Sequence, residues 1–308
     1  MSAQATDTGI AVIVNGASGC GHGDDVVAAI EAHFMAAGMT VRAMLVDAGA
    51  IKDAAERAIQ GGARVVVVGG GDGTLSTVAS VLVDSEVALG VLPLGTLNHF
   101  AKDQQIPLDL AGAVRTIIAG HSERADVGDV NGRVFINNSS LGIYPDIVRL
   151  RERQRARLGI GKWAALATAT WLVLRRASTL RVRMTADTDE RLYCTPFAFI
   201  GNNEYVLDGF EIGARKTLQG GVLSLYTARR TGRLGVLHLA LQALLGRLRG
   251  GSDFDAVTAR DIVIETRRRR ISVATDGEVS VLEVPLHYRS RPRALRVLVP
   301  QADAGDGT

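Results

Sequence analysis

The stretch Val65-Val66-Val67-Val68-Gly69-Gly70-Gly71-Asp72-Gly73-Thr74 decides how the first part of this chain folds. Four consecutive β-branched residues predict a buried strand of a parallel sheet. After the glycines, apolar residues recur at helical spacing from Leu75 to Val83, which predicts a helix. A strand, a glycine turn and a helix N-terminus together form an anion site, because glycines let the backbone approach a phosphate and the first helical N–H groups point at it.

Asp72 is the unusual residue of this turn. A carboxylate beside a bound phosphate repels it unless a cation or a transferable proton lies between them, and phosphoryl-transfer sites use this arrangement. The alternative is an Asp-Gly turn that joins a strand to a helix and binds no ligand. The turn by itself leaves both interpretations open.

The segments around this turn alternate between strand and helix. Strands are expected at Ile10–Val14, Val41–Val46 and Val87–Leu92, and helices at Asp24–Ala37, Lys52–Gln60 and Leu108–Ala119. This alternation predicts a doubly wound parallel α/β sheet, whose ligands bind at the carboxyl ends of the strands. Further polar turns follow at such ends, one beginning at Asn15 and one running from Pro93 to Ala101, where Asn98 is either a site residue or a helix cap.

A Rossmann dinucleotide site is the weaker interpretation of this half of the chain. Asp47 ends the second expected strand, where a ribose-binding acid would stand. However, Gly19 and Gly21 are followed by Asp24 instead of a glycine in register, and no Walker A sequence occurs.

From Arg133 onward the pattern predicts a β-rich second domain. Short β-like runs occur at Val134–Asn137, Leu180–Met184, Thr195–Ile200, Val222–Thr227, Ile262–Thr266, Ile271–Thr275 and Ala294–Val299. Helices are expected at Arg149–Arg176 and Leu234–Arg249. The first begins with alternating arginines and carries two tryptophans, so it is either a helix on an anionic membrane surface or a solvated arm followed by a core helix. We place the domains at residues 1–128 and 129–300, with the final strand (about 294–299) returning to the first domain and a flexible tail at 301–308.

Composition sets outer bounds on function. The chain has 308 residues, of which 47% are hydrophobic and 22% charged, with a formal net charge of +3. This length suits two domains. Two cysteines give no disulfide framework, which favours a cytoplasmic location. No signal peptide, membrane-spanning helix or nucleic-acid-binding motif is expected.

Three turns, taken together, resemble the diacylglycerol kinase catalytic family of bacterial and eukaryotic lipid kinases. They are Gly70–Thr74, Leu92–Ala101 and Asp276-Gly277-Glu278, the last of which is otherwise an ordinary hairpin turn. The second turn resembles the lipid-kinase branch more than the related NAD kinases. The resemblance extends from about Ile10 to Val299.

The resemblance implies an N-terminal α/β nucleotide-binding domain, a C-terminal β-sandwich-like domain and an active site in the cleft between them. It implies ATP and Mg²⁺, with a hydroxyl of diacylglycerol or a related lipid as acceptor. Residues implied to bind ATP are Asn15, Gly70, Gly71, Asp72, Gly73, Thr74, Gly95, Thr96 and Asn98. Asp276 is implied as the general base, with Asp72 as the alternative. Glu278 would hold Mg²⁺ with Asp72, and Asp126 would lie near the acceptor.

Several positions depart from the family pattern. Gly16 stands where a proline is usual, His99 where an aspartate is frequent, and Ser76-Thr77 where Asn-Glu is usual. A Leu-Asp-Asp-Gly run tied to a structural metal appears here as Leu218-Gln219-Gly220-Gly221, which counts against a second metal site.

Two other functions remain open at this stage. One is a kinase of a soluble substrate, as in NAD kinases, and the other is a nucleotide-binding module without catalysis. For the lipid kinase we expect peripheral contact with the anionic inner face of the membrane. The acceptor lipid, and the choice between a monomer and a homodimer, stay undecided.

Overall fold

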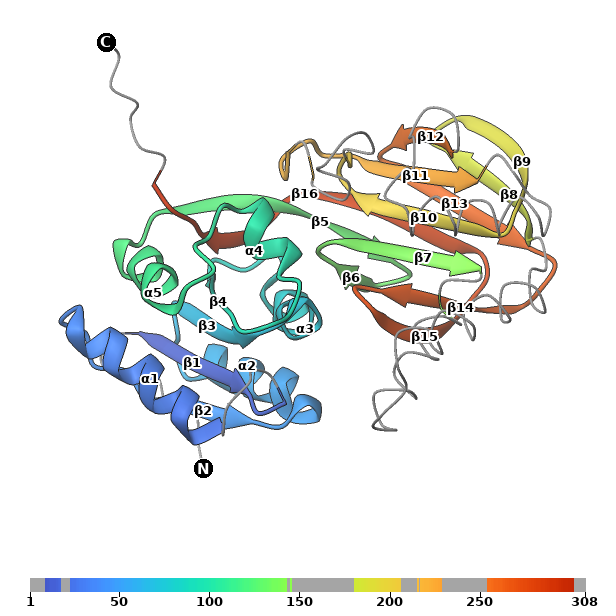
Figure 1. The fold of residues 1–308 in the computed structure, drawn as a ribbon. Helices are drawn as coiled ribbons and strands as arrows, with labels where there is room; N and C mark the ends of the chain where they lie inside the picture. The colour runs from blue at the N-terminus through green and yellow to red at the C-terminus, as the bar shows by residue number, and fades with distance from the viewer. Residues whose placement is uncertain are drawn as a thin grey trace, which may run out of the picture. The chain divides into compact units, whose positions relative to one another are not determined.

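The computed structural model describes residues 9–17, 23–142, 145, 180–205, 215, 217–228 and 254–301 (Figure 1). The helices expected at Arg149–Arg176 and Leu234–Arg249 lie outside these residues. By its contacts the chain divides into two compact units. The first comprises residues 1–127 and 292–308, and the second residues 128–291. No helix in the described part of the chain is long and apolar enough to cross a membrane.

The first unit is built on a parallel sheet with the strand order β2-β1-β3-β4. Its strands are β1 (Ile10–Asn15), β2 (Ala43–Val46), β3 (Val65–Gly70) and β4 (Ala88–Pro93). Every residue of β1 and β4, and all of β3 after Val65, is buried. This is the burial expected of a sheet covered on both faces. The end of β16 (Leu286–Leu298) adds to it, with Val297 parallel to Leu89 of β4.

Helices cover both faces of this sheet (Figure 1). They are α1 (Gly23–Ala36), α2 (Ile51–Gln60), preceded by the short 3₁₀ turn η1 (Ala48–Ala50), α3 (Asp72–Leu82), α4 (His99–Asp103) and α5 (Leu110–Ala119). Helix α1 contacts α5, and α2 contacts α3. The chain moves outward from β1 to β2 in one direction and to β3 and β4 in the other. Right-handed crossovers therefore place α1 and α3 on opposite faces of the sheet. The strand order reverses between β1 and β3, which makes this the topological switch point of the sheet.

The second unit is a sandwich of two antiparallel sheets. One contains the start of β16, then β13 (Asp261–Thr266), β8 (Leu180–Ala186) and β9 (Asp189–Thr195). The other has the order β12 (Phe254–Ala259), β11 (Leu223–Ala228), β10 (Phe197–Asn202), β7 (Asn138–Gly142), β14 (Arg270–Thr275) and β15 (Glu278–Glu283). A continuous apolar core fills the sandwich and includes Leu141, Met184, Ile200, Ile264 and Tyr288. The predicted fold class, a parallel α/β domain followed by a β-sandwich, is confirmed.

Several elements were not expected from the sequence. These are α4, β7, β9, β12 and β5 (Ser122–Val130), which pairs with β16 and with β6 (Arg133–Phe135). Strand β16 also begins at Leu286, eight residues before the expected start at Ala294. Strand β7 carries only one large apolar residue, Leu141, and is held because β10 and β14 pair with it on both sides. Strand β9 is an edge strand of exposed, mostly polar residues, so it has no alternating pattern.

Candidate phosphate-binding site

The turn between β3 and α3 has the form predicted from the sequence. Gly71 is the N-cap of α3 in extended conformation, and no side chain caps the first helical turn. A Cβ at Gly70 would lie 2.6 Å from the Cβ of Thr74, so only glycine fits where the strand enters the turn. No side chain competes with a ligand for the N-terminus of this eleven-residue helix, and such a helix end favours the binding of an anion.

The turn after β4 packs directly against this first turn. A Cβ at Gly95 would lie 2.5 Å from the Cα of Gly71, and a Cβ at Gly71 would lie 3.3 Å from the Cα of Gly95. The two backbones therefore approach as closely as they do only because both positions are glycines. Two motifs that are separate in the sequence are brought together at the carboxyl end of the sheet.

Asn98 fastens the second turn from within. Its backbone is left-handed, with φ of 51°. The side-chain oxygen accepts from the N–H of Gly95 (3.0 Å), and the amide nitrogen donates to the carbonyls of Pro93 (3.2 Å) and Gly95 (2.9 Å). Asn98 occupies the N-cap position of α4 but makes no capping hydrogen bond, so it holds the turn and does not cap the helix with its side chain.

Asp72 ties the two turns together. Its Oδ1 accepts from the N–H of Phe100 (3.0 Å), and its Oδ2 accepts from the N–H of His99 (3.2 Å). The carboxylate thus satisfies the first turn of α4, which Asn98 does not. The departure at position 99 leaves this contact intact, because His99 contributes its backbone.

The end of β1 joins the same group. The Asn15 side-chain amide donates to Thr74 Oγ1 at 2.8 Å, and its Oδ1 accepts from the N–H of Ala17 at 3.0 Å. Asn15 and Thr74 are both buried. The residues at the carboxyl ends of β1, β3 and β4 therefore form one connected group. Its members are Asn15, Gly70, Gly71, Asp72, Thr74, Gly95 and Asn98. Gly73 lies in the first turn of α3, and Thr96 is exposed on the turn after β4.

In the second unit, Asp276 lies on the hairpin turn between β14 and β15. Its φ is 46°, and Gly277 follows at 87°. The carboxylate accepts three backbone N–H groups, from Ile136 (2.7 Å), Asn137 (2.9 Å) and Asn138 (3.0 Å). Beside it, the Glu278 carboxylate pairs with the Arg133 guanidinium at 3.3 Å. The turn is therefore fixed in place by β6 and by the segment that leads into β7.

A polar cluster around residues 136–138 was missed from the sequence, where Val134–Asn137 was expected to be a plain strand. The buried Arg215 donates to the Ile136 carbonyl (2.6 Å) and to Asn137 Oδ1 (2.9 Å). The Tyr205 hydroxyl donates to the Asn137 carbonyl at 3.0 Å. The sequence around Arg215 has neither helical nor strand periodicity, so no local pattern predicts that this arginine is buried. The same short segment therefore carries both the Asp276 contacts and this cluster.

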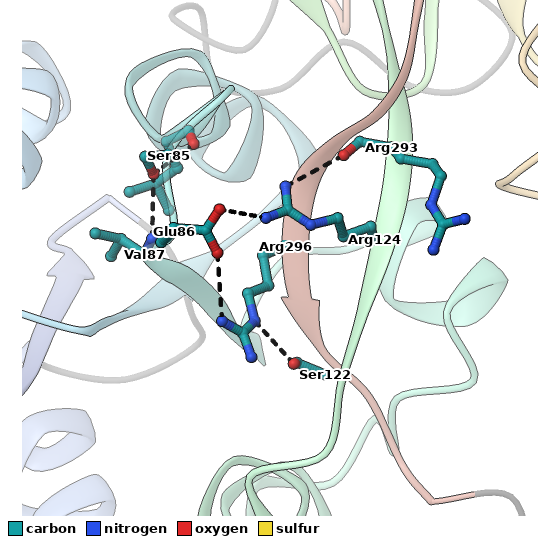
Figure 2. A network of polar contacts seen from close by, with 8 residues as sticks. Ser85, Glu86, Val87, Ser122, Arg124, Arg293 and Arg296 are labelled. Carbon is teal, nitrogen blue, oxygen red and sulfur yellow. Dashed lines mark hydrogen bonds and ion pairs between the residues drawn. The ribbon is translucent and has the colours of Figure 1, made fainter.

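Asp126 belongs to the contacts that attach β16 to the first unit. It is fully buried, and its Oδ1 accepts from the N–H of Arg293 at 2.8 Å. The backbone of Arg293 is left-handed, with φ of 55°. Figure 2 shows the neighbouring network, in which Glu86 meets Arg124 at 2.6 Å and Arg296 at 3.7 Å. Arg124 also donates to the Arg293 carbonyl, and Arg296 donates to Ser122. The hydrogen bond to Arg293 gives Asp126 a structural task at the positive-φ position of β16.

Comparisons with known proteins agree with this architecture. The family described as diacylglycerol kinase catalytic domain matches residues 9–130, and the YegS C-terminal NAD kinase beta sandwich-like domain matches residues 142–299. A diacylglycerol kinase of Staphylococcus aureus (strain JH9) is 42% identical over 90 residues, which are 29% of this chain and 29% of that protein. The matched stretch thus spans less than a third of the curated relative.

Solved structures share the fold over nearly the whole chain. A crystal structure described as a putative diacylglycerol kinase from Bacillus anthracis has a TM-score of 0.72 at 22% identity, covering 94% of this chain and 96% of that one. A second structure, also described as a putative diacylglycerol kinase from Bacillus anthracis, has a TM-score of 0.70 at 24% identity. It covers the same shares of the two chains. At such identities these structures support the fold alone. With both domain families matched in order along the sequence, the chain belongs to the diacylglycerol kinase catalytic-domain family.

Proposed function

We propose that this protein is an ATP-dependent lipid kinase, which transfers the γ-phosphate of ATP to a hydroxyl of diacylglycerol or a related lipid. The observation that carries the proposal is the pair of glycine turns that meet at the carboxyl ends of β3 and β4, with the N-terminus of α3 in the first of them. Such a site suits a nucleotide's phosphate chain, because close backbone approach and a helix N-terminus both favour anions. Family membership supports the acceptor class.

Asp72 is proposed to bind magnesium at this site. Among the described residues, no three His, Cys, Asp or Glu side chains gather closely enough to form a complete metal cage. Mg²⁺ is usually held by one or two carboxylates, substrate phosphates and water. When bound, Mg²⁺ would neutralise charge on the phosphates. The hydrogen bonds from His99 and Phe100 would keep the Asp72 carboxylate in one orientation, and Glu278 is the proposed second carboxylate.

Asp276 is proposed as the general base that accepts the proton of the attacking hydroxyl. Three backbone N–H groups fix its carboxylate, so its position does not depend on rotamer freedom. Phosphoryl transfer asks the protein mainly for positioning and charge neutralisation, and a fixed carboxylate meets the first requirement. Asp126 is proposed to act near the acceptor through the backbone that it holds in β16.

A substrate panel tests this proposal. The purified protein is incubated with ATP and Mg²⁺ and with diacylglycerol in detergent micelles, other lipid alcohols in the same micelles, or NAD. We expect labelled phosphate on a lipid alcohol. Phosphate transfer to NAD alone would support a soluble-substrate kinase instead, and ATP binding without any transfer would support a non-catalytic module.

A further inference from the structure

An arginine-lined hollow lies on the β8–β9 side of the second unit. Its volume is about 630 Å³, and it is lined by β8, β9 and the end of β13. Val182 and Met184 of β8 are buried in the sandwich core. Because side chains alternate along a strand, Arg181 and Arg183 project from the opposite, outer face of the sheet. Arg267 follows β13 directly and lines the same hollow.

The charges of this hollow are only partly balanced. Arg183 is held between Glu190 (3.3 Å) and Glu265 (3.8 Å). Within the described part of the chain, Arg181 and Arg267 take part in no ion pair, and both side chains are exposed. Arg268 and Arg269 continue the basic run on the turn after β13. Arginines in this state are available to an external anion.

The basic turn has a defined shape. Thr266 Oγ1 accepts from the N–H of Arg268 at 3.0 Å and donates to the Arg268 carbonyl at 3.1 Å. The N–H of Val284 donates to the Arg269 carbonyl at 3.0 Å. These contacts hold the backbone on both sides of the turn, so the arginines project from a backbone that is fixed by hydrogen bonds.

An apolar side chain stands among these arginines. Leu192 of β9 pairs in register with Arg183 and is 79% exposed, on the edge strand of the sheet. A soluble anion would make use of the arginines but not of Leu192. A bilayer with anionic headgroups would use both, because its phosphates meet the guanidinium groups while its interface accepts an apolar side chain.

We propose that Arg181, Leu192 and Arg267–Arg269, together called the β8–β9 surface, dock this protein on an anionic bilayer. The choice of a bilayer over a protein partner rests on the proposed function, since a lipid acceptor lies in a membrane. Docking by this surface would raise the local concentration of the acceptor.

Vesicle sedimentation tests the docking surface. The vesicles contain phosphatidylglycerol in phosphatidylcholine, or phosphatidylcholine alone, without diacylglycerol and without ATP. We expect the native chain to sediment with the anionic vesicles at low salt, less at high salt, and not with phosphatidylcholine alone. The R181E/R267E double variant should lose about tenfold or more in apparent affinity, given roughly fivefold per basic residue near such a surface. L192S should weaken binding by about threefold or more.

Matched variants control for charge and hydrophobicity. R42E/R115E makes the same charge change at two exposed arginines of the first unit, and M35S removes an exposed apolar side chain of α1. Both should bind vesicles as the native chain does. Unchanged binding of R181E/R267E, equal losses in the control variants, or equal binding to both vesicle types would each overturn the proposal.

A second assay separates docking from catalysis. With a water-soluble short-chain diacylglycerol, the R181E/R267E variant should phosphorylate at the native rate, and only its rate on vesicles should fall. A native chain that phosphorylates nothing but binds anionic vesicles through this surface would refute the proposed function and leave the docking surface standing.

Discussion

At the level of single residues, the close contact between Gly71 and Gly95 leaves no room for a side chain at position 95. We expect Gly95→Ala to lower the free energy of unfolding by about 1–3 kcal/mol, because its Cβ would lie 2.5 Å from backbone and 2.6 Å from Asn98 Oδ1. It should also weaken ATP binding, since the two turns must separate. Chemical denaturation and ATP titration measure the two effects. Gly49→Ala is the control, with nothing within 4 Å of the added Cβ, and should change stability by less than about 0.5 kcal/mol.

Asp276 has a structural task in addition to its proposed catalytic one. In Asp276→Asn, one acceptor oxygen becomes an NH₂ group facing backbone N–H donors, which should destabilise the second unit by about 1–3 kcal/mol. If Asp276 is also the base, phosphate transfer should fall about 100-fold or more at a temperature where the variant stays folded. The affinity for ATP should hardly change.

A matched aspartate separates these two roles of Asp276. Asp129 also accepts a backbone N–H, from Gly132 on the turn between β5 and β6, so Asp129→Asn makes a similar structural change in the same unit. We expect it to keep near-native transfer. A rate for Asp276→Asn that drops no further than that for Asp129→Asn would remove Asp276 from the reaction.

Among the strands, β16 joins the two sheets of the sandwich through Tyr288. The Tyr288 hydroxyl lies 3.1 Å from Ser139 Oγ of β7, and burial raises the pKa of Tyr288 well above its ordinary value of 10.0. In the unfolded chain this tyrosine ionises near about pH 10, but in the fold it stays neutral. The neutral hydroxyl therefore costs no stability below about pH 10. Above that pH the free energy of unfolding falls by up to about 1.4 kcal/mol per pH unit.

Tyr288→Phe tests this pH dependence. Near neutral pH the variant should be less stable by about 1 kcal/mol, because the bond to Ser139 is lost. Above about pH 10 its stability should fall less steeply than that of the native chain. Denaturation curves at pH 8 to 11 measure both slopes, with the partly exposed Tyr193 replaced by Phe as the control. Parallel slopes for the native chain and Tyr288→Phe would show that this hydroxyl does not set the alkaline limit.

The sequence predicted those elements that carry a strong local signal. The strand Val65–Gly70 and helix α3 were foreseen because four β-branched residues and a clean helical spacing flank the glycines. Strand β7 was not, because Ser139 and Ser140 are buried by pairing with β10 and β14, which no local pattern encodes. In the site, Asn15 and Asp72 were named in advance, but the hydrogen bonds of Asp72 to α4 and of Arg215 to Asn137 depend on contacts between distant segments.

For the molecule as a whole, the proposed function requires that the phosphate site of the first unit serves a transfer reaction. The most direct test measures the rate at which label passes from the γ-phosphate of ATP to diacylglycerol in micelles with Mg²⁺. It compares the native chain with Asp72→Asn and with Asp53→Asn, an exposed carboxylate of α2 that serves as the control. We predict transfer by the native chain and by Asp53→Asn, and a loss of about 100-fold or more in Asp72→Asn. Equal transfer by all three proteins, or none by the native chain, would contradict the proposed function.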